Sequence, residues 1–229
     1  MNQIVRANIS RNSFLKIGIG ILGLASLSRI LNSCKSDPII GGSGYTSNGY
    51  GFGSGDIALL NYLYVIEQVQ AAFYLKWVNA LKTSNPSLFY LGHLGDIALH
   101  QATHCAFFNN ALGTNAIPIL NLDFSGIDFT NASQLLILGQ KFQETELGAY
   151  LGISSSFQSS AFLTLSQQIS SVEARHTSYL TGLNQTNSFM NSALLNAGGY
   201  ENSLNPSTVF SFYKSYIKTP LDLTSLPTG

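Results

Sequence analysis

The chain contains four long stretches in which hydrophobic residues recur at alternating steps of three and four positions. This spacing places the hydrophobic residues on one face of an α-helix. The sequence therefore predicts four amphipathic helices and an all-α domain. The stretches run from Asp56 to about Leu81, from Pro86 to Gly113, from Thr130 or Asn131 to Ile153, and from about Ser159 to Gly182.

The lengths of the connections predict the topology. The first and second helices are joined by a short loop, as are the third and fourth, so each pair should form an antiparallel hairpin. About seventeen residues separate the second helix from the third, which is enough chain to cross the length of a bundle. We therefore expect residues 56–184 to form a four-helix bundle with one long crossover. Residues 185–229 are expected to form an irregular extension that packs on it.

Each of the four hydrophobic faces is interrupted near its middle by polar residues of the types that bind metals. Buried polar groups cost free energy unless they are partnered, so coincident interruptions predict one polar centre shared by all four helices. The interruptions are Gln70 on the first helix, Gln101 and His104 on the second, Gln143 and Glu146 on the third, and Glu173 and His176 on the fourth.

This pattern is typical of a di-metal site that has lost acidic ligands. A di-iron or di-manganese centre in a four-helix bundle takes one Glu from each of two helices and a Glu-x-x-His motif from each of the other two. The fourth helix carries the full motif, Glu173-x-x-His176, whereas the second has Gln101 in place of the acid. Gln70 and Gln143 are amides at the single-ligand positions. Because an amide brings no negative charge, the sequence predicts a degenerate centre with weak or no binding of iron or manganese.

A displaced site is an alternative. Glu67 and Glu146 each lie one turn from a single-ligand amide, in opposite sequence directions. Since the first and third helices should be antiparallel, both acids would move the same way along the bundle, by about 4.5 Å. They could then bind metal together with Glu173 and either His100 or His104. A further alternative is a hydrogen-bond network without metal, in which the amides and Tyr150 satisfy the acids and histidines.

The N-terminal part of the chain does not fit the bundle pattern. Residues 1–34 resemble an export signal, with basic residues around a hydrophobic run at 17–27. This segment ends in Leu-Asn-Ser-Cys, which resembles a bacterial lipobox and predicts that Cys34 is lipidated and anchors the protein to a membrane. The alternative is a plain secretion signal or an uncleaved anchor. Residues 35–55 contain seven glycines and are expected to form a flexible tether.

Composition narrows the functional classes. With 45% hydrophobic and 10% charged residues, most of the chain should fold rather than remain disordered. After Cys34 it carries seven Lys or Arg residues against 11 Asp or Glu residues. Without a basic patch, nothing indicates a nucleic-acid partner.

Several of these segments are similar to the exported bacterial ferritin-like domain family, which is related to the desiccation-associated ferritin-like proteins. The similarity covers residues 53–190 and implies a ferritin-like four-helix bundle. It also implies a di-metal centre in which Glu usually stands at the positions of Gln70, Gln101 and Gln143. The matching segments include Gly53-Ser54-Gly55-Asp56, Glu67-Gln68-Val69-Gln70, Asn115-Ala116-Ile117-Pro118, Gly148-Ala149-Tyr150 and Val172-Glu173-Ala174-Arg175-His176.

Together these observations predict an exported, lipid-anchored ferritin-like protein of the cell envelope with a degenerate di-metal centre and a stress-related role. Catalysis is not expected from such a centre. One alternative is an active di-iron or di-manganese protein that oxidises iron or handles peroxide through the displaced site. Another is a purely structural or interaction module.

Overall fold

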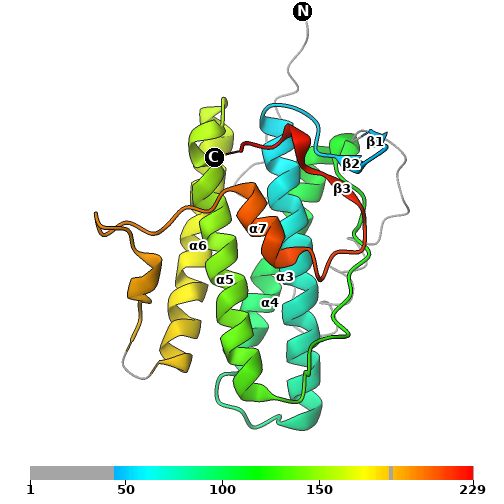
Figure 1. Ribbon diagram of the computed structural model, residues 1–229. Helices are drawn as coiled ribbons and strands as arrows, with labels where there is room; N and C mark the ends of the chain where they lie inside the picture. The colour runs from blue at the N-terminus through cyan, green and yellow to red at the C-terminus, as the bar shows by residue number, and fades with distance from the viewer. Residues whose placement is uncertain (1–43, 186–187, 229) are drawn as a thin grey trace, which may run out of the picture.

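The structure, a computed structural model, describes residues 44–185 and 188–228. Four long helices dominate it (Figure 1), and they confirm the all-α four-helix bundle. They are α3 (Asp56–Ser84), α4 (Leu91–Leu112), α5 (Ala132–Ile153) and α6 (Ser160–Asn184). Within the described ranges, no helix is both long enough and hydrophobic enough to span a membrane. The predicted export signal and Cys34 lie outside these ranges.

The topology has the single long crossover that the loop lengths predict. Helix α3 packs along α4, and α5 packs along α6. Residues 113–131 run down the side of the bundle between the end of α4 and the start of α5 (Figure 1). The side chain of Asn61 on α3 holds the start of this crossover, because it donates to the carbonyl of Asn115 and accepts from the N–H of Ile117.

One helix start differs from the expectation. Helix α4 begins at Leu91 rather than at Pro86, because two successive turns, closed at Leu88 and Leu91, reorient the chain first. Helix α3 begins at Asp56, as expected. The Asp56 carboxylate accepts the backbone N–H groups of Gln158 and Ser159, which ties the α5–α6 loop to the start of α3.

Part of the glycine-rich segment is folded, in contrast to the expected flexible tether. Strands β1 (Tyr45–Thr46) and β2 (Gly49–Gly51) pair antiparallel, and β2 pairs in parallel with β3 (Leu221–Asp222). At Gly49, φ is +127° and a Cβ atom would lie 2.5 Å from the backbone of Pro220. Glycine therefore permits the close pairing of β2 with the C-terminal segment.

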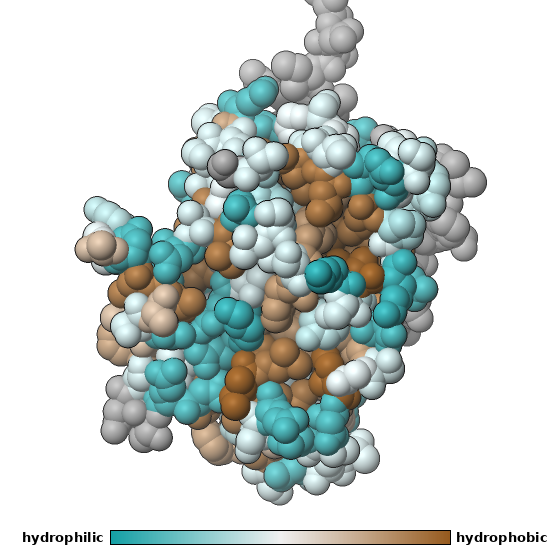
Figure 2. Space-filling model, in the orientation of Figure 1, coloured by the Kyte–Doolittle hydropathy of each residue, from teal (hydrophilic) through white to brown (hydrophobic). Residues whose placement is uncertain are grey.

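The C-terminal extension also contains a short helix, α7 (Pro206–Tyr213), which packs across α5. Asn205 caps it by accepting the N–H of Thr208, and Pro206 occupies the first helical turn. Figure 2 shows hydrophobic residues on this face above and below α7. The remaining short elements are the 3₁₀ turns η2 (Gly113–Asn115), η3 (Ser154–Ser156), η4 (Ser192–Leu194) and η5 (Leu223–Ser225).

An aromatic layer fills the bundle next to the polar interruptions. Phe73 and Phe142 stack with their ring centroids 4.2 Å apart, and Trp77 is also buried. At Gly139 a Cβ atom would overlap the ring of Trp77, so the absence of a side chain there lets α5 approach α3 closely. The bundle therefore surrounds its polar residues with tightly packed, buried side chains.

Candidate metal centre

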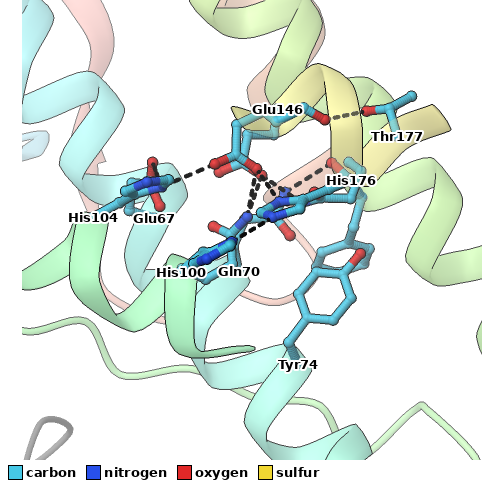
Figure 3. A network of polar contacts seen from close by, with 12 residues as sticks. Glu67, Gln70, Tyr74, His100, His104, Glu146, His176 and Thr177 are labelled. Carbon is cyan, nitrogen blue, oxygen red and sulfur yellow. Dashed lines mark hydrogen bonds and ion pairs between the residues drawn. The ribbon is translucent and has the colours of Figure 1, made fainter. Parts of the chain in front are cut away.

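Three acidic side chains from three different helices are fully buried in the middle of the bundle. Glu67 comes from α3, Glu146 from α5 and Glu173 from α6, and each is 0% exposed. Carboxylates are almost never fully buried unless they are paired or bind a metal. The four-helix fold therefore builds a polar centre, as the interrupted hydrophobic faces predict (Figure 3).

Two histidines contact the acids directly. His104 Nδ1 on α4 lies 2.9 Å from Glu173 Oε1 and 3.5 Å from Glu67 Oε1. His176 Nδ1 lies 2.9 Å from Glu173 Oε2. His100 Nδ1 instead lies 2.9 Å from the Nε2 atom of His176 (Figure 3). Of the two histidines considered with the displaced site, His104 therefore joins Glu67 and Glu173.

The amide of Gln101 lies between two of the acids. Its Nε2 donates to Glu146 Oε2 at 3.0 Å and to Glu173 Oε2 at 2.7 Å. Gln143 adds a second donor to Glu146 Oε2, at 2.6 Å. Amide hydrogens thus separate Glu146 from Glu173 and offset part of their mutual repulsion.

The amide of Gln70 makes no hydrogen bond to the three acids. Its Nε2 donates to the carbonyl of Phe142 at 2.8 Å and to the Tyr213 hydroxyl at 3.0 Å. The structure therefore places the carboxylates at the level of Glu67 and Glu146, one turn away from the expected ligand positions Gln70 and Gln143. Glu67 precedes Gln70, and Glu146 follows Gln143. Because α3 and α5 run in opposite directions, both acids are displaced the same way along the bundle.

With this register, the centre follows the di-metal pattern at every position except Gln101. Glu67 and Glu146 supply the single acids, and Glu173-x-x-His176 supplies one complete motif. The other motif is Gln101-x-x-His104, in which an amide replaces one acid. The sequence pattern indicates that amides replace three acidic ligands. In the structure an amide replaces only one of them, at Gln101.

Two tyrosine hydroxyls complete the surroundings of the centre. The Tyr150 hydroxyl donates to Glu67 Oε1 at 2.5 Å, in keeping with its expected place in a polar network. Tyr213 on α7 donates to the carbonyl of Phe142 and also accepts from Gln70. Sequence reasoning missed Tyr213, although the Asn205-Pro206 helix start and the spacing from Val209 to Tyr213 are signals of an amphipathic helix.

Burial and charge set the protonation of the centre. Burial raises the pKa of Glu67, and burial together with the charges of Glu173 and Glu67 raises the pKa of Glu146 well above its ordinary value. Burial alone would lower the pKa of His104, but the Glu67 and Glu173 carboxylates outweigh it and raise this pKa to about 10. Burial opposes ionisation of Glu173, yet hydrogen bonds from His104 and His176 hold its pKa below the usual range.

The residues at the centre fit a bound cation. Glu67, His104 and Glu173 form a group in which one ligand atom from each lies within 4.8 Å of the others. Two carboxylates and one imidazole suit iron and manganese. Burial of an oxygen that accepts no hydrogen bond costs free energy, and a bound cation would offset this cost. In the described part of the chain, such atoms at the centre include Glu67 Oε2, Gln101 Oε1, Gln143 Oε1, Glu146 Oε1 and Glu173 Oε1.

A four-helix bundle with one long crossover and a buried Glu/His centre defines the ferritin-like class of proteins. Residues 55–186 match the model of the ferritin-like domain family. Because this match spans more than half of the chain, the chain belongs to the ferritin-like domain family. No curated protein matches the chain.

Proposed function

We propose that this ferritin-like domain binds a divalent transition metal ion, iron or manganese, in the middle of its helix bundle. Glu67, His104 and Glu173 would be the ligands. When bound, either ion supplies a charge that neutralises buried carboxylates, and iron also offers reversible one-electron chemistry. The leading prediction from the sequence, a weak or absent site, assumed that three acids were lost.

The observation that carries the proposal is the convergence of Glu67, His104 and Glu173 in a fully buried position. The Nδ1 atom of His104 lies 2.9 and 3.5 Å from oxygens of the two acids. Ligands bound to one ion at about 2.1 Å are separated by roughly 3–4 Å, so these groups need little rearrangement to share an ion. A second oxygen of Glu67 accepts no hydrogen bond and is also available.

The test is the metal content of the full chain purified without chelator. We expect iron or manganese in the wild-type protein, measured by elemental analysis, and a loss of at least tenfold in Glu67→Gln. Glu144→Gln is the matched control. Glu144 is another buried acid, on α5, but it pairs with Gln140 and Asn191 rather than with the centre. Equal metal content in wild type and Glu67→Gln would contradict the proposal.

We also propose that the protein is exported and anchored by a lipid on Cys34. The support is the basic and hydrophobic pattern of residues 1–34 and the Leu-Asn-Ser-Cys sequence that ends it. Expression of the full chain in a bacterium, followed by membrane fractionation and mass spectrometry, tests this. We expect a lipidated membrane protein, and loss of the lipid mass in Cys34→Ser. Identical masses after allowance for the substitution would contradict it.

A stress-related role is part of the same proposal. A redox-active ion enclosed by Glu67, Glu146 and Glu173, all fully buried, would be shielded from uncontrolled reaction with peroxide. Deletion of the protein should then sensitise cells to peroxide in the presence of iron. An unchanged peroxide tolerance would speak against this role, while leaving metal binding to be decided by elemental analysis.

A further inference from the structure

The central residues divide into two groups that share Glu173. We define the His104 half as Glu67, His104 and the Oε1 atom of Glu173, and the His176 half as Glu146, His176 and the Oε2 atom of Glu173. A complete di-metal pattern would hold one ion in each half. We propose that this chain takes a single divalent ion, in the His104 half, because the amide of Gln101 fills the His176 half. This inference rests on the proposed metal-binding function and specifies its stoichiometry.

The amide of Gln101 already lies between the two acids of the His176 half. Its nitrogen donates to Oε2 of both Glu146 and Glu173, at 3.0 and 2.7 Å. A cation held between these two Oε2 atoms would need the same two oxygens. The amide therefore occupies the place between them that an ion would take, and it supplies two hydrogens where the ion would supply charge.

The two histidines differ in the number of carboxylates that they face. His176 Nδ1 lies 2.9 Å from one acid, at Glu173 Oε2, and its Nε2 lies 2.9 Å from His100 Nδ1. His104 Nδ1 faces two acids, Glu173 at 2.9 Å and Glu67 at 3.5 Å. An ion bound through Nδ1 of a neutral imidazole would therefore meet two carboxylates in the His104 half. The group of candidate ligands found in the described ranges is accordingly the His104 half.

The total charge of the buried acids also favours one divalent ion over two. With Gln101 neutral, the three buried acids bring at most three negative charges, whereas two divalent ions bring four positive charges. An unbalanced charge in a dry interior is strongly unfavourable. One ion is neutralised by two of the acids, Glu67 and Glu173. The third acid, Glu146, is instead held by the amides of Gln101 and Gln143.

The test is the number of Mn²⁺ ions bound per chain by the metal-free full-length protein, measured by equilibrium dialysis and elemental analysis. We expect one ion in the wild type. Gln101→Glu supplies the fourth acid and should bind two ions, and the magnetic coupling of two neighbouring Mn²⁺ ions should appear in the electron paramagnetic resonance spectrum. Gln70→Glu is the matched control. It adds the same charge at a side chain that hydrogen-bonds to Phe142 and Tyr213 rather than to the acids, and it should remain at one ion.

The outcomes separate this inference from the proposed function. Two ions in the wild type would overturn the single-ion inference and leave metal binding intact. No ion in the wild type would contradict metal binding itself. A folded Gln101→Glu protein that still binds one uncoupled ion would overturn the role of the amide. If Gln101→Glu does not fold, the wild-type count alone decides between one ion and two.

Discussion

The His104 half and the His176 half of the polar centre contain the same kinds of side chain but are filled differently. In the His104 half, an imidazole faces two carboxylates directly, at 2.9 and 3.5 Å. In the His176 half, the Gln101 amide lies between the carboxylates, and His100 contacts the outer nitrogen of His176. In one half a histidine nitrogen faces two carboxylates, as in a set of metal ligands, and in the other an amide joins two carboxylates by hydrogen bonds.

The difference shows how a single amide can change a charged centre without changing the fold. A Gln side chain has nearly the shape of Glu, but it donates two hydrogens and carries no charge. At position 101 it donates a hydrogen bond to one oxygen of Glu146 and to one of Glu173 without any cation. The helices can therefore keep the same packing while one of two ion positions is replaced by hydrogen bonds.

The largest effect should come from Glu173, because it belongs to both halves. We expect Glu173→Gln to weaken Mn²⁺ binding at least 100-fold and to lower the free energy of unfolding by about 3 kcal/mol, since His104 and His176 lose their shared partner. Dialysis and urea unfolding measure the two quantities. A Glu173→Gln protein with wild-type affinity would show that the two halves do not share this acid as a ligand.

The two histidines should differ in their effects on metal affinity. His104→Gln removes a proposed ligand and should weaken Mn²⁺ binding by at least 100-fold. His176→Gln alters only the support of Glu173 and should cost roughly tenfold, as expected for a group that orients a ligand. Isothermal titration of both variants tests the comparison. The reverse order would place the ion in the His176 half.

Stability should distinguish the two glutamine positions. Gln70→Glu loses the donors to Phe142 and Tyr213 and should cost about 2 kcal/mol, with no recovery when metal is added. Gln101→Glu should also destabilise the metal-free protein, but Mn²⁺ should restore its melting temperature. Thermal unfolding with and without Mn²⁺ measures this. Rescue of Gln70→Glu by metal would place the ligand level at Gln70 after all.

The Mn²⁺ affinity of the His104 half should also depend on pH. This effect should be reversible and smaller than the effects of the substitutions. In the metal-free protein the pKa of His104 is raised from 6.5 to about 10, so at pH 7 its ring is protonated and an ion must displace that proton. Apparent Mn²⁺ affinity should therefore rise with pH, by roughly tenfold per pH unit between pH 7 and 9. The same protonation stabilises the metal-free fold below pH 6.5, and this contribution is lost as the pH approaches 10. An affinity that does not change over this range would exclude His104 as the ligand.

Much of this architecture can be predicted from the sequence because helical periodicity and loop lengths are local properties. They give the four helices, the crossover and the existence of a polar centre. They do not give the level at which two helices meet, since Glu67 and Gln70 lie on the same face of α3. Packing between the helices fixes that level. For this reason the sequence pattern favours Gln70 and Gln143 as the ligand positions, whereas in the structure Glu67 and Glu146 occupy them.

The C-terminal part of the chain was harder to predict for a different reason. Helix α7 has eight residues and no long periodic pattern, so its placement depends on distant contacts. The segment before it reaches α5 only because Gly148 and Gly152 have no side chains there, and Leu204 donates to the carbonyl of Gly148. The pairing of Tyr50 with Leu221 likewise joins residues far apart in the chain. Such contacts leave little trace in local sequence.

The central claim is that the His104 half, and not the His176 half, holds the ion. Crystals of the protein soaked in Mn²⁺ and measured for anomalous scattering test it most directly. The account predicts one peak per chain, within bonding distance of Glu67, His104 and Glu173. A peak between Glu146 and His176, or a pair of peaks in the wild-type protein, would contradict it.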